Sequence, residues 1–245
     1  MQDVLKSFKE FKLSGMVASL EERLNYAKSN KLSHQQLLEL LCEDEVSMRR
    51  ENNYKKRYSA SKLPSNKRLE DFNLDFQPSI DAKIVSDIAT CQFIDKKEDV
   101  IFVGGPGTGK THLSISFGLK ALERGYSVRF ITVSDMLNNL HLSRADNSYH
   151  KQIKRLVDYD LLILDELGFK TIPKFAADDF FNVISRRYEK KSTIITTNKS
   201  ISEWNDIFEE AVLTQAITDR LLHHSTIFDI KGPSYRTKSV VKEAA

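Results

Sequence analysis

The stretch that decides the fold reads Gly104-Gly105-Pro106-Gly107-Thr108-Gly109-Lys110-Thr111 and matches GxxxxGK[ST] at every fixed position. Glycines let such a loop turn closely around a phosphate, and the loop amides then form an anion-binding nest. The lysine of the motif, Lys110, is expected to reach the β- and γ-phosphates, and the Thr111 hydroxyl to ligate Mg²⁺. An apolar run precedes the motif, and a helical pattern that begins near Lys110 and includes His112 follows it. We therefore expect residues 104–112 to bind ATP with Mg²⁺ rather than to form a glycine-rich turn without a ligand.

Strand and helix patterns alternate around this loop. Short apolar runs occur at 100–103, 127–132, 160–164, 192–197 and 226–230, and helix-length segments lie between them at 110–124, 134–142, 149–157, 176–189 and 211–223. Alternation of this kind is typical of an α/β domain with a parallel sheet, here of five strands.

The chain before this domain has a helical pattern. Apolar residues recur at three- and four-residue spacing from residue 2 to about residue 60, and Ser33 with Gln36 matches a capping box that opens a helix over 37–58. Residues 59–77 lack sustained periodicity, and a further helix is expected over 79–93. We predict a helical N-terminal DNA- or partner-binding domain at 1–60, a basic linker leading into the next domain at 61–78, and an ATPase domain at 79–245.

Composition excludes several classes of protein. Of the 245 residues 40% are hydrophobic and 29% charged, with a net charge of +3, and no apolar run approaches the roughly 20 residues of a membrane span. The two cysteines, Cys42 and Cys91, lie far apart and indicate neither a disulfide framework nor a zinc site. We expect a protein of the reducing cytoplasm with no membrane partner.

Two acidic residues follow the third apolar run. Leu161-Leu162-Ile163-Leu164 leads directly into Asp165 and Glu166, and ligands of open α/β sheets bind at the carboxyl ends of the strands. Asp165 would hold Mg²⁺ and Glu166 would activate the attacking water as general base. The alternative is a strand that ends in two surface acids.

Two further residues are candidates for the hydrolytic site. Asn198 follows the fourth run and suits a residue that orients the attacking water, although an ordinary turn residue would have the same position. Arg220, on a late helix, suits an arginine finger that reaches the γ-phosphate of a neighbouring subunit. Its alternative is an internal ion pair with Asp219 or Glu210.

Basic residues gather in two stretches that would contact DNA phosphates without reading bases. The alternative for both is a solvated helix face. The candidates are Arg49, Arg50, Lys55, Lys56 and Arg57 in the first stretch, and Arg144, Lys151, Lys154 and Arg155 in the second.

Seven stretches together resemble one family, the IstB-like AAA+ ATPases encoded beside the IstA transposase in bacterial insertion sequences. The stretches cover nearly the whole chain and are FKLSGM (11–16), RLEDFNL (68–74), GGPGTGKTHL (104–113), YDLLILDELGF (159–169), ISRRYEKKSTIITTNKSISEW (184–204), AITDRLLHH (216–224) and KGPSYR (231–236). The helicase loader DnaC is a more distant likeness that shares the ATPase core.

The resemblance implies an AAA+ P-loop NTPase fold and an ATP-dependent homo-oligomer. Proteins of this family assemble on double-stranded DNA, deform it and stimulate a partner, here an IstA-like transposase. By position it gives the phosphate-loop roles to Lys110 and Thr111, the roles of Mg²⁺ ligand and base to Asp165 and Glu166, and the sensor and finger roles to Asn198 and Arg220. It puts Leu69 and Phe72 beside the adenine.

Two features depart from common patterns. The acidic pair is Asp-Glu, where many IstB-like sequences have Asp-Asp, and only fifteen residues follow Ile230 (245 − 230), too few for a full C-terminal lid. Arg236 is a candidate for a second charge that senses the nucleotide. The alternatives to a transposition regulator are a DnaC-like helicase loader and a nucleotide-gated protein-binding adaptor without DNA contact.

Overall fold

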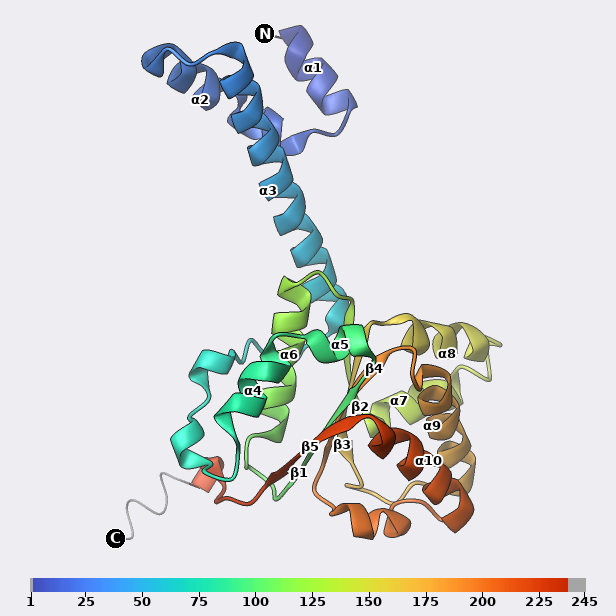
Figure 1. Cartoon of the computed structure of the whole chain (residues 1–245). Helices are drawn as coiled ribbons and strands as arrows, with labels where there is room; N and C mark the ends of the chain where they lie inside the picture. The colour runs from blue at the N-terminus through green and yellow to red at the C-terminus, as the bar shows by residue number, and fades with distance from the viewer. Residues whose placement is uncertain (1, 238–245) are drawn as a thin grey trace. The chain divides into compact units, whose positions relative to one another are not determined.

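The structure is a computed structural model and describes residues 2–237. Its internal contacts divide the chain into two compact units, with the boundary after Arg57. The N-terminal unit is helical, and the C-terminal unit is built on a five-stranded parallel sheet with helices on both faces (Figure 1). The predicted fold class is therefore confirmed. Among the described residues, no helix combines the length and apolar character that a membrane crossing needs.

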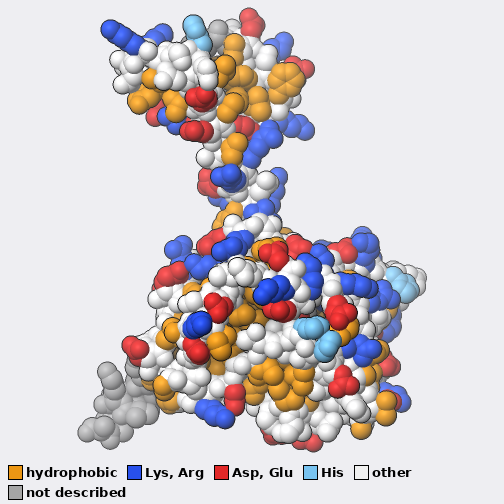
Figure 2. All heavy atoms as spheres, in the orientation of Figure 1, with side chains coloured by type: hydrophobic (Ala, Val, Ile, Leu, Met, Phe, Trp, Pro, Cys, Tyr) orange, Lys and Arg blue, Asp and Glu red, His pale blue; other side chains and the backbone are white. Residues whose placement is uncertain are grey.

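The N-terminal unit consists of α1 (Gln2–Glu10), α2 (Ser14–Asn30) and most of α3 (His34–Ser61). The capping box is present, because the Ser33 amide donates to Gln36 Oε1 at 2.8 Å and the Gln36 amide donates to Ser33 Oγ at 3.2 Å. The cap starts α3 at His34, three residues before the predicted position. Figure 2 shows hydrophobic side chains on the surface of this unit, and the exposed ones include Phe11 and Leu38.

Gly15 brings α2 against α3. A Cβ at this position would lie 2.6 Å from the Asp44 carbonyl oxygen and from the Glu45 Cα. The Gly15 amide donates to Glu45 Oε2 at 2.6 Å, so the carboxylate of one helix caps the start of the other. Burial by itself would raise the pKa of Glu45, but hydrogen bonds from Arg49 and from the α2 amides outweigh it and lower that pKa. Gly15 of the FKLSGM stretch thus allows the two helices to pack closely.

The C-terminal unit continues from the end of α3. Its strands are β1 (Asp99–Gly104), β2 (Val128–Thr132), β3 (Leu161–Leu167), β4 (Ser192–Thr197) and β5 (Ser225–Ile230). Its α-helices are α4 (Ala82–Ala89), α5 (Gln92–Lys96), α6 (Lys110–Glu123), α7 (Val133–Leu142), α8 (Tyr149–Asp158), α9 (Lys174–Arg187) and α10 (Ala211–His223). Short 3₁₀ turns are η1 (Leu69–Asp71), η2 (Leu74–Phe76), η3 (Ile201–Asp206) and η4 (Tyr235–Thr237).

The sheet has the strand order β2-β3-β4-β1-β5, with all neighbours parallel. On one face, alternate residues such as Phe102 and Ile163 meet α6, and Phe102 stacks between Phe117 and Phe228. On the other face, residues such as Ile101 and Leu164 join one core with α7, α9 and α10 (Figure 1). Because each strand is buried on both faces, the sequence reads as continuous apolar runs.

Two expectations about local structure differ from what is observed. The helix expected over 79–93 is interrupted at Cys91, whose φ of 60° is left-handed, and forms α4 and α5. The segment expected as a linker packs on α6 instead: Ser116 Oγ donates to the Lys67 carbonyl at 2.9 Å, and Lys120 pairs with Glu70 at 2.9 Å. The sequence did not predict these contacts, because the segment is polar and shows no apolar pattern. Its backbone, rather than apolar side chains, supplies several of the contacts.

We predict that Gly15→Ala destabilises the N-terminal unit by about 1–3 kcal/mol, since backbone atoms of α3 must move to admit the methyl group. The gain in helix propensity from alanine, about 1 kcal/mol, is smaller. Hydrogen exchange of the α2 amides in the full-length protein measures the effect. Ser29→Ala, at an exposed site on the same helix, is the control and should leave exchange unchanged. Equal protection in both variants would contradict this account of the packing.

Candidate functional site

Side-chain alternation brings residues of three elements together at the carboxyl edge of the sheet. Asp165 on β3 and Thr196 on β4 both point to the α6 face, where Thr111 lies in the first turn of the helix. Thr111 Oγ1 donates to Asp165 at 3.0 Å to Oδ1 and 3.2 Å to Oδ2, and Thr196 Oγ1 also donates to Oδ1. A buried carboxylate needs such donors, because burial without them is costly.

The two acids differ in environment because the β3–β4 register shifts between Leu164 and Leu167. Bulges of this kind are common beside active sites, where they redirect a side chain. Glu166 has a left-handed φ of 64° and an exposed side chain, and its amide donates to Thr196 Oγ1 at 3.0 Å. Thr196 therefore contacts both acids. Sequence reasoning missed it, although its place one residue before the end of a buried strand was a usable signal.

The phosphate loop joins β1 to α6 as predicted. Gly107 and Gly109 have φ values of 78° and 102°, and a Cβ at Gly109 would lie 2.5 Å from the Phe72 ring. Lys110 Nζ donates to the carbonyl oxygens of Gly104 and Gly105, both at 2.7 Å. Burial lowers the pKa of the Lys110 ammonium group and the charge of Arg236 lowers it further, while Asp165 and Glu166 oppose the shift. An anionic ligand bound at the loop would place negative charge beside the Lys110 ammonium group.

A hollow of about 190 Å³ opens beside the loop. Its lining combines loop residues with aromatic side chains from two distant segments, namely Phe72 and Phe76 before the sheet and Tyr235 after it. The Phe72 and His112 rings meet edge to face, with centroids 5.3 Å apart. Aromatic walls next to an anion-binding loop suit a nucleotide, with its base against the rings. Leu69 is half-buried in η1 and does not belong to this lining.

The C-terminal segment, residues 231–236, packs on the same loop. Its position follows from the register of β5, which pairs Ile230 with Gly104. The Tyr235 amide donates to the Gly107 carbonyl at 2.9 Å, and Gln77 Nε2 donates to the Pro233 carbonyl at 3.0 Å. This segment closes one side of the hollow with Tyr235 and Arg236.

Asn198 and Arg220 lie in different surroundings. Asn198 is exposed and follows β4, whose last residue, Thr197, pairs with Val103 of β1 and Leu167 of β3. Asn198 therefore lies just beyond the carboxyl end of β4, between the phosphate loop that follows β1 and the acidic pair on β3. Arg220 lines a separate surface hollow, where Nη1 donates to the Ala216 carbonyl at 2.7 Å and the guanidinium lies 5.0 Å from the Phe181 ring. Within residues 2–237 it forms no ion pair with Asp219 or Glu210.

The candidate DNA contacts are mostly exposed, but several are already paired. Arg144 makes a bidentate ion pair with buried Asp179 at 2.7 and 2.8 Å and lies over the Tyr149 ring. Its guanidinium therefore joins the segment between α7 and α8 to α8 and α9. Other ion pairs join Arg49 to Glu45, Lys55 to Glu51 and Lys154 to Asp158. Arg50 and Lys56 are exposed on α3, where Arg57 is half-buried.

Helix α8 carries the most regular basic surface. Lys151, Lys154 and Arg155 are spaced by three and four residues and share one exposed face. Arg155 also lines a hollow of about 220 Å³ together with Lys62 and Arg129, and no acidic residue belongs to its lining. The hollow suits an anion such as a backbone phosphate. Arg129 was not among the sequence-based candidates, because it lies alone in an otherwise apolar strand.

Comparisons with known proteins agree with this description. The family model described as IstB-like ATP binding protein matches residues 6–243. A Geobacillus stearothermophilus protein, named as an ATP-binding protein of insertion sequence IS5376, is 40% identical over 87% of this chain and 85% of its own length. A Pseudomonas aeruginosa protein, named as an ATP-binding protein of insertion sequence IS21, is 38% identical over 93% and 86%.

A likeness of fold extends to the crystal structure of the DnaC helicase loader. The TM-score is 0.54 and the identity 24%, over 61% of this chain and 87% of that one. At this identity the comparison speaks for the fold alone.

We predict that Thr196→Val weakens Mg²⁺-dependent binding of ATP by about 10- to 100-fold, because Asp165 loses one of the two hydroxyl donors that orient it. Titration of a fluorescent ATP analogue, with Mg²⁺ and then with EDTA, measures the effect. Thr196→Ser keeps the hydroxyl group and should behave as wild type, and the two variants should agree once EDTA removes the metal. A valine variant with wild-type affinity in Mg²⁺ would rule out this role.

Proposed function

This chain belongs to the family of IstB-like ATP binding proteins, and we propose that it is an ATPase that assembles on target DNA and stimulates the transposase of its insertion sequence. The observation that carries the proposal is the hydrogen-bonded link between phosphate loop and acidic pair through Asp165. A loop that binds phosphates needs no such link, whereas a site that holds Mg²⁺ and a lytic water beside the γ-phosphate does.

Several residues of this chain would each have a separate role in hydrolysis. Lys110 would exchange its two loop carbonyls for the β- and γ-phosphates, and Thr111 with Asp165 would offer the hard oxygen ligands that Mg²⁺ prefers. Mg²⁺ held by these two residues would neutralise charge that develops on the phosphates. Glu166, which the bulge turns toward solvent, takes a proton from the attacking water, and Asn198 orients that water. Arg236, which lines the hollow from the C-terminal segment, would offer the phosphates a further positive charge.

Arg220 would complete the site of a neighbouring subunit. It lines a hollow that shares no residue with the lining of the nucleotide hollow, so it is available to a second copy of the chain. A finger in one subunit and a loop in the next make a head-to-tail interface, which generates rings or helical filaments. Hydrolysis would then depend on assembly.

Double-stranded DNA would bind through backbone contacts repeated along the assembly. The basic face of α8, the hollow lined by Lys62 and Arg129, and the exposed arginines and lysines of α3 supply positive charge without base-reading elements. Bending the duplex costs several kcal/mol, which many such contacts can offset. The protein would act where the DNA lies, in the cytoplasm, beside an IstA-like transposase. The likeness to DnaC is one of fold and does not favour helicase loading.

We predict that duplex DNA binds with an ATP analogue present and that affinity falls steeply with salt. Fluorescence anisotropy of a labelled duplex at several salt concentrations measures both. Removing two phosphate contacts with Lys151→Ala and Arg155→Ala should reduce the slope of log K against log salt by about 2.

Two controls accompany this measurement. Lys83→Ala, at an exposed lysine of α4, should leave the slope unchanged, and Lys110→Ala should abolish the ATP-dependent component. If the wild type binds nucleotide but no DNA at any salt concentration, the protein is a nucleotide-gated adaptor and the DNA proposal fails.

We predict that Glu166→Gln and Arg220→Ala are each inactive as ATPases and restore activity when mixed. In the mixture, a subunit with Arg220→Ala supplies Glu166, and a neighbour with Glu166→Gln supplies the arginine. Random assembly at equal amounts leaves about a quarter of the interfaces complete, so about a quarter of wild-type phosphate release is expected. A mixture as inactive as its components would place the arginine's role within one subunit.

A further inference from the structure

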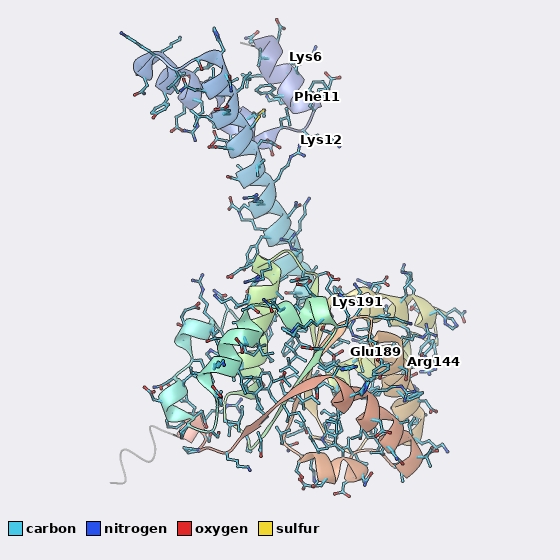
Figure 3. The ribbon with its side chains drawn as sticks, in the orientation of Figure 1. Lys6, Phe11, Lys12, Arg144, Glu189 and Lys191 are labelled. Carbon is cyan, nitrogen blue, oxygen red and sulfur yellow. The ribbon has the colours of Figure 1, made fainter. Side chains whose placement is uncertain are left out.

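Two of the six histidines in the chain are adjacent at the end of α10 and face a carboxylate from another element. Glu189 lies in the turn between α9 and β4, and its Oε1 is 3.9 Å from His223 Nδ1 and 3.6 Å from His224 Nε2. The two imidazole centroids are 3.9 Å apart. Figure 3 labels Glu189 at this surface, and Figure 2 shows histidine side chains gathered on the same unit.

The backbone on both sides of this cluster is held in place. The amides of Lys190 and Lys191 both donate to the Arg187 carbonyl at 2.9 Å, and Glu189 takes a left-handed φ of 56° within this turn. On the other side, the His224 carbonyl accepts from the Asp99 amide at 2.8 Å, at the start of the β1–β5 pairing. The three side chains therefore project from a fixed turn and a fixed helix end, although each is about half exposed.

The spacing of the donor atoms suits one metal ion. Zinc binds imidazole nitrogens and carboxylate oxygens at about 2.0–2.2 Å, so two donors across a tetrahedral ion lie about 3.3–3.5 Å apart. The observed separations of 3.6 and 3.9 Å need closing by only a few tenths of an ångström, and all three donor atoms lie within 4.8 Å of one another. Small side-chain rotations would suffice, because all three side chains are exposed.

We propose that Glu189, His223 and His224 form a binding site for a divalent transition-metal ion, with Zn²⁺ as the best match. Two imidazoles and one carboxylate favour zinc, nickel, cobalt or copper. Magnesium prefers oxygen ligands and retains water, so the Mg²⁺ that accompanies ATP does not compete here. The fourth position of a tetrahedral ion remains for water or for a side chain of a neighbouring molecule.

Metal binding would alter the surroundings of Arg220, a consequence that rests on the proposed function. Tyr188 Oη lies 2.6 Å from His223 Nδ1, and a metal ion on that nitrogen displaces this hydrogen bond. Tyr188 and His223 line the same surface hollow as Arg220, which lies one turn earlier on α10. An ion that joins the Glu189 turn to the end of α10 would restrict the helix that carries the proposed finger.

Calorimetry with ZnCl₂ and visible absorption with Co²⁺ test the proposal. The sample is full-length protein without an affinity tag, treated with a chelator and kept in a buffer containing Mg²⁺. We expect about one ion per chain, with an absorption band of Co²⁺ bound to nitrogen. His224→Ala and Glu189→Gln should each weaken Zn²⁺ binding by at least about tenfold. His150→Ala removes an exposed histidine of α8 and should leave binding unchanged.

Two outcomes would overturn the proposal. One is wild-type protein that binds neither ion, which would leave the cluster as surface contacts between a glutamate and two histidines. The other is wild-type affinity in both His224→Ala and Glu189→Gln. ATP affinity in Mg²⁺, measured on the same samples, should be equal in all variants, because the cluster lies outside the nucleotide hollow. Loss of ATP binding by the wild type itself would count against the proposed function and not against the metal site.

Discussion

The hydrogen bonds of the Asp165 carboxylate are the interaction on which the rest of the site depends. This side chain is 5% exposed and accepts from Thr111 at the start of α6 and from Thr196 on β4. A buried carboxylate is tolerated only with such partners. Satisfying it fixes the first turn of α6, and with it the phosphate loop, relative to the acidic end of β3. The loop and the acids are therefore parts of one site.

The order of the strands provides the remaining groups. β1 lies between β4 and β5, so the phosphate loop emerges with Asn198 on one side and the C-terminal segment on the other. The segment bonds to the loop through Tyr235 and to the residues before the sheet through Gln77 and Pro233. Residues 231–236 thus line one side of the nucleotide hollow, with Tyr235 and Arg236. β5 brings the chain to Gly104 directly, because it pairs Ile230 with that residue.

The N-terminal unit is packed differently from the C-terminal unit. Its helices are mostly exposed, and the few buried positions include Gly15, Leu20 and Glu45. Close approach of α2 and α3 depends on the missing side chain of Gly15 and on a carboxylate that caps the neighbouring helix. The apolar periodicity that predicted helices here leaves several large side chains, such as Phe11 and Leu38, at the surface.

The sequence by itself determined the fold class, the phosphate loop and the acidic pair. These are local: GxxxxGK[ST] and an apolar run ending in Asp165 and Glu166 carry their geometry in adjacent residues, and continuous burial on both sheet faces leaves an apolar signature. The ends of the elements were also largely predicted, with β4 at 192–197 and α10 at 211–223 as expected.

Only the tertiary structure decided which distant side chains meet. Thr196 contacts both acids through the β3–β4 register, Arg144 is engaged by Asp179, and Tyr235 reaches the loop through β5. Glu189 meets His223 and His224 because a left-handed turn redirects the chain after α9. Contacts of this kind depend on strand order, register and backbone turns across 30 or more residues. No spacing along the chain encodes them, since the same residue types would be ordinary surface groups in another topology.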